Sequence, residues 1–294
     1  MTSGIIIDRF TQLTLGLILL LSTAGLAFIL VFILREAYPA MSGENSVLDY
    51  LFRTAWTPLA RPPEFGIVHS WLSTLMLVAI CIAIAAPVGF GIGLFISDIA
   101  PVIVRLVLQP CLDVLAGIPS VVYGFFGYVT LVPWFEVRYE MATGECILVA
   151  ALILAVMVLP FVASVSAGAF QSVSANLREA ALAQGVTRWY MIRRVVIPKA
   201  APGMFAAVTL ALTRAIGETM AVLMLTGNSV ALPVSPLDRG QPLTALIATE
   251  FGEAGVGSEK YYALFASASV LVALVFAFNV LTWTLKRKLI SNEH

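Results

Sequence analysis

Charged residues are scarce in this chain of 294 residues, and their scarcity excludes an ordinary soluble domain. Asp, Glu, Lys and Arg make up 12% of the residues, about half the share of a typical soluble protein, whereas 60% of the residues are hydrophobic. A chain this apolar cannot cover its surface with polar groups, so lipid must be the solvent for much of it. The 17 basic and 17 acidic residues balance, so no net positive charge favours nucleic-acid binding.

Cysteine, histidine and lysine are also scarce, which narrows the chemistry that the chain can carry. The three cysteines are scattered through or beside apolar runs and the two histidines lie far apart, so no metal-ligand spacing is present. None of the lysines stands in the glycine-rich motif of a nucleotide-binding P-loop. We therefore expect no cofactor and no enzyme activity in this chain, and if it takes part in active transport, the energy must come from elsewhere.

What the sequence has in abundance is long apolar runs. A helix needs about 20 apolar residues to cross about 30 Å of hydrocarbon, where every backbone polar group must be paired. Six runs meet this requirement: Leu13–Leu34, Trp71–Ser97, Leu106–Pro133, Cys146–Phe170, Gly203–Gly227 and Tyr261–Leu285. The sequence therefore predicts an all-α, polytopic membrane protein with about six transmembrane helices.

The runs divide the chain into three parts. We expect residues 1–65 to form an N-terminal anchor helix and a periplasmic segment. The anchor is expected to be retained, because its run exceeds the length of a signal-peptide core and no small-residue cleavage site follows it. Residues 66–286 are expected to form the transmembrane domain and residues 287–294 a cytoplasmic tail.

Basic residues set the expected orientation. They gather in the loop of residues 171–202, called the inner loop here, and in the cluster Lys286–Lys288 near the end of the chain. Positively charged loops stay on the cytoplasmic side of a membrane. Both termini of this inner-membrane protein are therefore expected to face the cytoplasm.

Small residues recur at helical spacing inside two of the runs. Gly89, Gly91 and Gly93 follow no predicted strand, which argues against a dinucleotide-binding loop. Such spacing, found also at Ser164 and Gly168, lets two helices approach closely. We expect close helix packing at these positions.

The inner loop has the pattern of two short helices. Asn176 and Glu179 have the spacing of a capping box, which predicts that a helix begins directly after Asn176. Gly185 is expected to end this helix in a left-handed turn. Thr187 is expected to cap a second short helix that leads to Pro198.

The inner loop resembles the EAA loop of bacterial ABC-importer permeases. Glu179, Ala180 and Ala181 form the motif itself, and Gly185 and Pro198 follow at the spacing of that family. The resemblance implies that the loop docks in a groove on a separate ATPase subunit, and the two small alanines permit a close approach. The alternative is an amphipathic elbow whose arginines face anionic lipid.

Two opposite charges stand near the middle of the fifth run. Arg214 and Glu218 are four residues apart, so in a continuous helix they share one face near the bilayer midplane. A charge at this depth costs about 2.5–3.5 kcal/mol on insertion scales, which argues against contact with lipid. A guanidinium is a planar donor fork suited to a tetrahedral oxyanion, so we interpret the pair as an anion site. An ion pair that only braces the bundle is the alternative.

The sequence around these charges is similar to that of the PstC-type permeases of the bacterial phosphate-specific transport system. The similarity extends from about residue 48 to residue 288. The run Met-Ala-Val after Gly-Glu-Thr favours PstC over the companion PstA, in which a proline commonly follows that point. The segments that carry the similarity are Thr213–Asn228, Ala116–Gly124, Trp56–Pro58, Phe65–Ile67 and Leu243–Leu246.

The resemblance implies a type I ABC-importer (MetI-like) fold and inward transport of inorganic phosphate, with Arg214 and Glu218 in the binding or translocation site. Ser120, which follows Pro119 in the third run, is a further candidate for lining the phosphate path. A plain helix kink at the proline is the alternative.

The implied partners are a PstA-like permease subunit, an ATPase subunit dimer that binds ATP and Mg²⁺, and a periplasmic phosphate-binding protein. A phosphate-signalling regulator is a further candidate. Three other functions stay open: a PstA-like subunit, a permease for another oxyanion such as sulfate or molybdate, and a scaffold that senses phosphate status. The inner loop argues against a scaffold, which needs no ATPase-docking helix.

Overall fold

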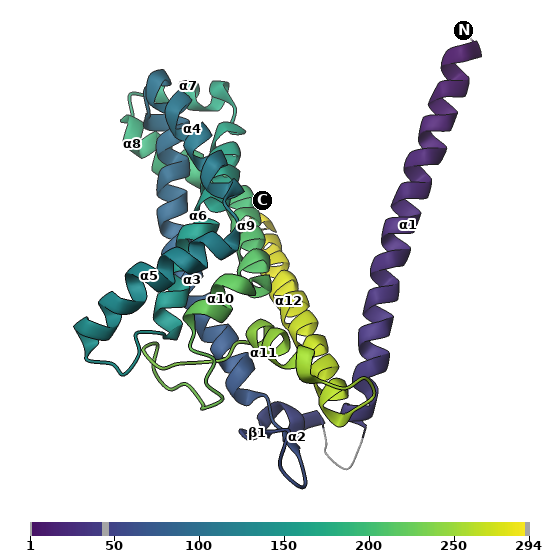
Figure 1. The fold of residues 1–294 in the computed structure, drawn as a ribbon. Helices are drawn as coiled ribbons and strands as arrows, with labels where there is room; N and C mark the ends of the chain where they lie inside the picture. Colours follow the sequence, from purple (N-terminus) through teal and green to yellow (C-terminus); the bar gives the residue numbers. More distant parts are fainter. Residues whose placement is uncertain (1, 43–46, 292–294) are drawn as a thin grey trace.

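The protein is a helical bundle in the computed structural model, which describes the backbone of residues 2–42 and 47–291 and the side chains of residues 11–42 and 47–287 (Figure 1). Its predicted all-α class is confirmed. In chain order the elements are α1 (Thr2–Met41), α2 (Val47–Phe52), β1 (Trp56–Thr57), β2 (Glu64–Phe65), α3 (Val68–Leu94), the π-helical turn η1 (Phe95–Ile99), α4 (Val102–Gly117), α5 (Ser120–Tyr139), α6 (Ile147–Gln171), α7 (Ala175–Ala183), α8 (Arg188–Met191), the π-helical turn η2 (Ile192–Val196), α9 (Ile197–Gly217), α10 (Met220–Leu225), α11 (Leu243–Glu250), the 3₁₀ turn η3 (Phe251–Glu253) and α12 (Glu259–Ser291).

Six helical segments in the described part of the chain are long and apolar enough to cross a bilayer, which confirms the predicted number. Each overlaps one of the six apolar runs. Two of those runs, Leu106–Pro133 and Gly203–Gly227, are however each divided by a break in the helix. The segments are Thr11–Met41, Val68–Ile99, Ser120–Tyr139, Ile147–Gln171, Arg188–Gly217 and Glu259–Arg287.

The third predicted run, Leu106–Pro133, is wrong as a single span, because the chain leaves the helix at Ile118. Ile118 is extended (φ −67°, ψ 129°) and Pro119 follows with φ −58°, so α4 ends and α5 begins within a few residues. The ring of a proline disfavours the helical conformation for the residue before it. Pro119 therefore marks a complete break in the helix and not the kink that was one of the expectations. Of the two helices, α5 alone is the candidate span.

The core of the bundle forms around α6, which packs against α3 along its length. Gly89 and Gly93 of α3 face Val162 and Ser166 of α6, and a Cβ atom at either glycine would collide with these side chains. The predicted close packing is confirmed at both glycines. It is wrong at Gly91 and at Gly168, because at each of them no described atom outside its own helix lies within 4 Å of the place that a Cβ atom would take.

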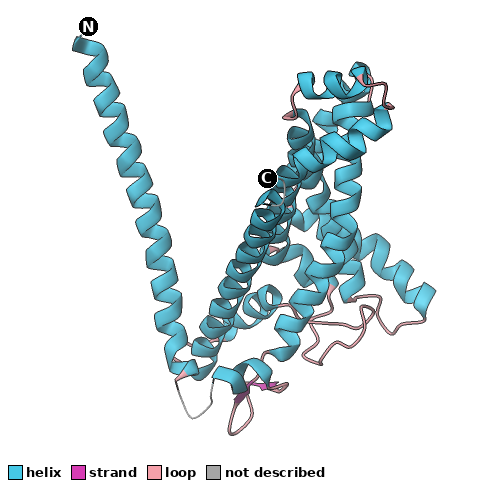
Figure 2. Ribbon diagram, turned by 180° about the vertical axis from the view of Figure 1, so that it is seen from behind, coloured by secondary structure: helices cyan, strands magenta, loops and turns pink. Residues whose placement is uncertain are grey.

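α1 stands apart from the bundle along most of its length (Figures 1 and 2). The C-terminal end of α1 meets α12. There the rings of Phe32 and Phe265 pack edge to face with 5.6 Å between their centroids, and Ala37 is buried. Its large apolar side chains from Leu13 to Leu30 are exposed. An apolar surface of this kind must be covered by lipid or by another membrane chain.

The short elements gather at opposite ends of the bundle (Figure 1). α7 and α8 lie at one end, and α2, α11 and the hairpin of β1 and β2 lie toward the other. In the hairpin, Trp56 pairs with Phe65. The first turn of α11 is buried, with Leu243 and Leu246 fully enclosed, so α11 is packed into this end of the bundle.

Candidate functional site

The fifth apolar run contains a second break, so the predicted continuous helix Gly203–Gly227 is wrong. α9 ends at Gly217, and Glu218 is extended (φ −71°, ψ 126°) before α10 begins at Met220. Glycine is a weak helix former, and a break at membrane depth needs partners for the freed backbone groups. The hydroxyl of Thr244 in α11 supplies one, because it donates to the Glu218 carbonyl oxygen at 2.9 Å.

This break separates Arg214 from Glu218. Arg214 lies in the last turn of α9, whereas Glu218 lies outside that helix, so the two side chains do not share one helix face as expected. No ion pair joins them among the residues that the structure describes. The Glu218 carboxylate instead accepts a hydrogen bond from the backbone N–H of Ala221 at 3.4 Å, at the start of α10.

The Arg214 guanidinium packs against an aromatic ring of the core helix. It lies over Phe161 of α6, 4.5 Å from the ring centroid, and it interacts electrostatically with Tyr123 of α5. Its Nε atom is buried and has no hydrogen-bond partner among the described residues. Leaving a buried donor unpaired costs about 1–3 kcal/mol. The side chain is therefore oriented by the ring and half-buried, and its Nε atom is left without a hydrogen-bond partner in the described chain.

The two helix breaks lie beside each other. Ser120 is the first residue of α5 and is half-buried. One turn later, Gly124 lies so close to Ala221 of α10 that a Cβ atom on it would be 2.9 Å from the Ala221 Cα atom. α5 and α10 therefore meet near their starts, which places Ser120 in the neighbourhood of Arg214 and Glu218. No described hydrogen bond joins Ser120 to either charge.

α7 begins earlier than the sequence predicted. Ser174 caps it, with its hydroxyl oxygen accepting a hydrogen bond from the Leu177 N–H at 3.4 Å, so the cap predicted at Asn176 is wrong. Both residues are good cap formers, and tertiary packing decides between them. Val173 is buried in the apolar cluster under the inner loop, and the helix starts at the first polar residue after this anchor.

The end of α7 is as predicted. Gly185 is left-handed (φ +79°), a conformation that favours glycine. The hydroxyl oxygen of Thr187 accepts a hydrogen bond from the Tyr190 N–H at 3.3 Å and so caps α8. The second helix does not stop near Pro198, however, because α8 continues through η2 into α9. The π-helical turn directly before the proline accommodates its missing N–H.

The EAA-type residues occupy an exposed end of the bundle. Glu179, Ala180 and Gly185 are exposed, whereas Ala181 packs on the apolar cluster beneath α7. Exposed apolar side chains on a polar end of a membrane protein indicate an interaction surface. Four such side chains surround the motif: Leu177, Leu182, Trp189 and Tyr190.

The predicted site residues thus fall into two groups, one at the helix breaks and one on the inner loop. Sequence reasoning did not assign Phe161, Tyr123 or Thr244 to the site, because each comes from a different helix. Tyr123 and Thr244 lie in segments that carry the family similarity, which is the one signal that could have found them. The break itself had a signal. A basic residue in the last turn followed by glycine, as in Arg214 and Gly217, is typical of a helix end.

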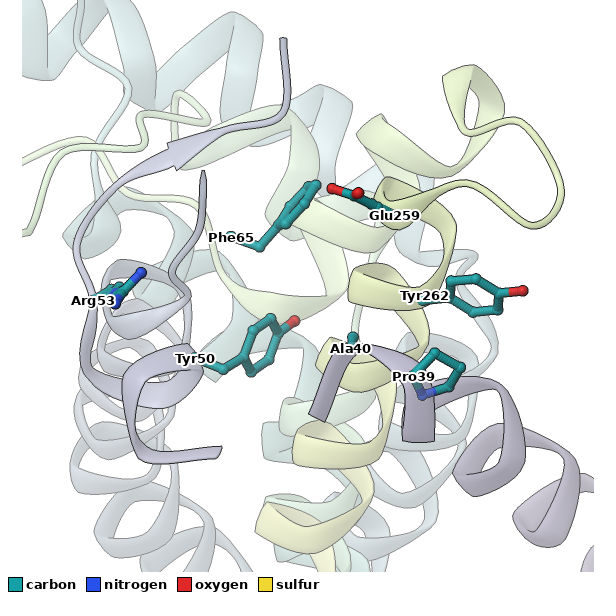
Figure 3. Close-up of a pocket in the computed structure, with 7 residues that line it drawn as sticks. All are labelled: Pro39, Ala40, Tyr50, Arg53, Phe65, Glu259 and Tyr262. Carbon is teal, nitrogen blue, oxygen red and sulfur yellow. The ribbon is translucent and has the colours of Figure 1, made fainter. Parts of the chain in front are cut away.

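A cavity of about 400 Å³ lies between the end of α1, α2 and the start of α12 (Figure 3). The Tyr50 hydroxyl donates to the Ala263 carbonyl at 2.5 Å, and burial raises the pKa of Tyr50. None of the predicted site residues lines this cavity, so we treat it as separate from transport. The lining residues are Pro39, Ala40, Tyr50, Arg53, Phe65, Glu259 and Tyr262.

Comparison with known proteins agrees with this geometry. Residues 89–290 match the family described as "Binding-protein-dependent transport system inner membrane component". The chain is 30% identical to the phosphate transport system permease protein PstC of Haemophilus influenzae, with 97% of this chain and 93% of the relative covered. It is 33% identical to the protein of the same name from Xylella fastidiosa, covering 89% and 87% of the two chains. The chain belongs to the PstC-type branch of this permease family.

Other matches extend the comparison. The permease is 38% identical to the probable ABC transporter permease protein YqgH of Bacillus subtilis, over 80% of this chain and 76% of the relative. Its fold is similar to that of the MetNI methionine ABC transporter in an inward-facing conformation (TM-score 0.56, 21% identity, 76% and 94% of the chains covered). It is also similar to a bacterial ABC transporter involved in alginate import (TM-score 0.62, 14% identity, 92% and 95% covered). The predicted MetI-like fold is confirmed.

Proposed function

We propose that the permease is the membrane-spanning subunit of an ATP-driven importer that moves inorganic phosphate into the cell. Relatives named as phosphate transport system permeases, which match most of the chain, support this assignment. The observation that carries it is Arg214, whose buried Nε atom has no partner among the described residues and lies at a helix break. A half-buried guanidinium that no described carboxylate neutralises is suited to bind a tetrahedral oxyanion.

Phe161 orients the fork of Arg214. A cation over an aromatic face is stabilised by about 0.5–2 kcal/mol, which fixes the guanidinium while leaving its in-plane donors free. Phosphate oxygens bind to those donors. Ser120, at the start of α5, contributes a hydroxyl to the wall of the same path.

Glu218 gives the site selectivity. In the empty state its carboxylate caps α10 through a 3.4 Å contact, which is long for a hydrogen bond and easily exchanged. When phosphate enters, the carboxylate accepts a hydrogen bond from a protonated phosphate oxygen. Sulfate carries no proton at neutral pH, so it meets the carboxylate with uncompensated repulsion.

The inner loop couples transport to ATP hydrolysis. Glu179, Ala180 and Ala181 on α7, with Gly185 at its end and Pro198 beyond, dock the loop in a groove of the ATPase dimer. The exposed apolar side chains around the motif support this role. Both termini then lie in the cytoplasm, and a PstA-like subunit and a periplasmic phosphate-binding protein complete the importer.

Competition in a reconstituted importer tests the substrate. The complete complex in proteoliposomes should take up radiolabelled phosphate only when ATP is supplied. Excess unlabelled phosphate should abolish this uptake, whereas sulfate and molybdate at the same concentration should leave it unchanged. Inhibition by sulfate or molybdate as strong as that by phosphate would overturn the assignment.

A further inference from the structure

A buried acidic residue, Asp98, lies outside the sites described above. It stands in η1, the π-helical turn at the end of α3, and only 2% of its side chain is exposed. Its carboxylate forms an ion pair with the Arg178 guanidinium and accepts a hydrogen bond from the Ser97 hydroxyl. Buried charges persist when they are paired, and π-helical turns are frequent at functional positions.

Asp98 holds both halves of the inner loop. Arg178 comes from α7, before the exposed turn at Gly185, and Arg188 comes from α8, after it. Arg188 donates a hydrogen bond to the backbone carbonyl oxygen of Asp98. Burial lowers the pKa of the Arg178 guanidinium, and the neighbouring Arg188 charge lowers it further. The ion pair with Asp98 opposes both effects.

Arg178 also fixes α7 to the helix before it. Its guanidinium donates to the carbonyl oxygens of Phe170 and Val173, at the end of α6 and just beyond it. The inner loop is therefore attached to α3 and to α6 as well as being continuous with α9. A loop fixed at three points moves as a rigid unit with the helices that hold it.

We propose that Asp98 is a positioning residue for coupling: it clamps the inner loop to α3, so that a displacement of the loop by the ATPase is passed to the membrane helices. This inference rests on the proposed coupling function of the loop. Without the clamp, the loop still docks on the ATPase, but α7 and α8 move without displacing α3.

The far end of α3 shows where such a movement leads. The Thr74 hydroxyl oxygen accepts a hydrogen bond from the Leu243 N–H at 3.0 Å, at the start of α11. The next residue, Thr244, donates to the carbonyl oxygen of Glu218 at the helix break. α3 therefore links the inner loop to the candidate transport site through contacts that are continuous in the structure.

Arg105 offers a matched control. It comes from α4 and donates to the Ser97 carbonyl oxygen at 2.9 Å, so it contacts the same π-helical turn, and no hydrogen bond or ion pair in the described chain joins it to the inner loop. If the turn needed arginine contacts only for its own stability, loss of Arg105 would act like loss of Arg178. The proposal requires the two variants to differ.

The test uses the complete importer with its ATPase and binding protein. Two quantities are measured: the hydrogen-exchange rate of the α7 amides and the ratio of binding-protein-stimulated to basal ATP hydrolysis. The comparison covers wild type, the control Arg105→Gln, and the variants Asp98→Asn, Arg178→Gln and Arg188→Gln. Asp98→Asn and Arg178→Gln should speed α7 exchange about tenfold and reduce the stimulation ratio about fivefold, as expected for local opening of a clamped element. The double variant Asp98→Asn/Arg178→Gln should be no worse than Arg178→Gln alone, because both changes remove the same ion pair between Asp98 and Arg178.

Arg105→Gln should stay within about twofold of wild type in both measurements. Three results would each overturn the proposed clamp. The first is unchanged α7 exchange in Asp98→Asn, and the second is faster exchange with a normal stimulation ratio. The third is an equal effect of Arg105→Gln and Arg178→Gln. Should Asp98→Asn fail to assemble, Arg178→Gln decides the matter by the same two measurements. Neither readout depends on phosphate uptake, so a wild-type importer that carries no phosphate would count against the proposed substrate alone.

Discussion

At the scale of single residues, the structure separates two charges that the sequence places together. Spacing alone puts Arg214 and Glu218 on one helix face, but the break at Gly217 directs each to a different partner. Arg214 packs on an aromatic ring and Glu218 caps α10. The arginine is therefore free of a protein carboxylate in the described chain, which is the condition for an anion site.

Glu218→Gln should lower phosphate uptake and narrow the difference between phosphate and sulfate. The amide offers a poorer acceptor to a protonated phosphate oxygen and no longer repels sulfate, and one such contact is worth about 1–3 kcal/mol. The measurement is uptake of both labelled anions by a permease variant that works without its binding protein, because that protein would otherwise select the anion first. Equal losses for both anions would assign Glu218 to capping α10 alone.

At the scale of elements, helix ends were the least predictable feature. The runs predict the number of spans correctly, yet the break at Glu218 depends on a hydroxyl from Thr244, and no local pattern indicates this contact. The start of α7 likewise depends on where Val173 is buried. Gly185 was predictable because a left-handed helix end is a local backbone property that glycine satisfies by itself.

Gly185→Val should weaken coupling. Its φ of +79° strains a β-branched residue by about 1–3 kcal/mol, and no described atom beyond its chain neighbours lies within 4 Å of the added Cβ atom, so the backbone is the only cause. Phosphate uptake and binding-protein-stimulated ATP hydrolysis should both fall, while the amount of permease in the membrane is unchanged. Gly185→Asn is the control, since asparagine tolerates this conformation, and it should retain most activity. Normal uptake by Gly185→Val would remove the coupling role from this turn.

Gly93→Ala should destabilise the contact between α3 and α6. The added methyl group would collide with Ser166 and lie 2.9 Å from the Ala163 carbonyl oxygen, so the two backbones must separate, at about 1–3 kcal/mol. Thermal unfolding of the detergent-solubilised importer should shift to lower temperature. Gly91→Ala, two residues away on the same helix, meets nothing within 4 Å among the described atoms and should leave the transition unchanged. Equal shifts for the two variants would show that the close contact is unimportant.

At the scale of the whole molecule, composition and run lengths sufficed to predict a six-span membrane protein, and the EAA-type and PstC-type segments sufficed for the family. The arrangement inside the membrane could not be predicted in the same way. Phe161 under Arg214, and Asp98 paired with Arg178 across 80 residues of sequence, are products of the packed bundle. A single chain has no pattern that brings such residues together.

The central claim is that Arg214 binds the transported phosphate, and one measurement tests it most directly. The initial rate of ATP-dependent phosphate uptake is compared in proteoliposomes that contain the importer with wild-type permease, Arg214→Gln, Arg214→Lys or Arg138→Gln. The uptake rate with Arg214→Gln should be about ten- to hundredfold lower, because a hydrogen bond to a charged group is worth about 1.5–3 kcal/mol. Arg214→Lys should recover part of the rate. Arg138→Gln, which changes an exposed arginine in the last turn of α5, should transport at nearly the wild-type rate. A wild-type rate for Arg214→Gln would contradict the account.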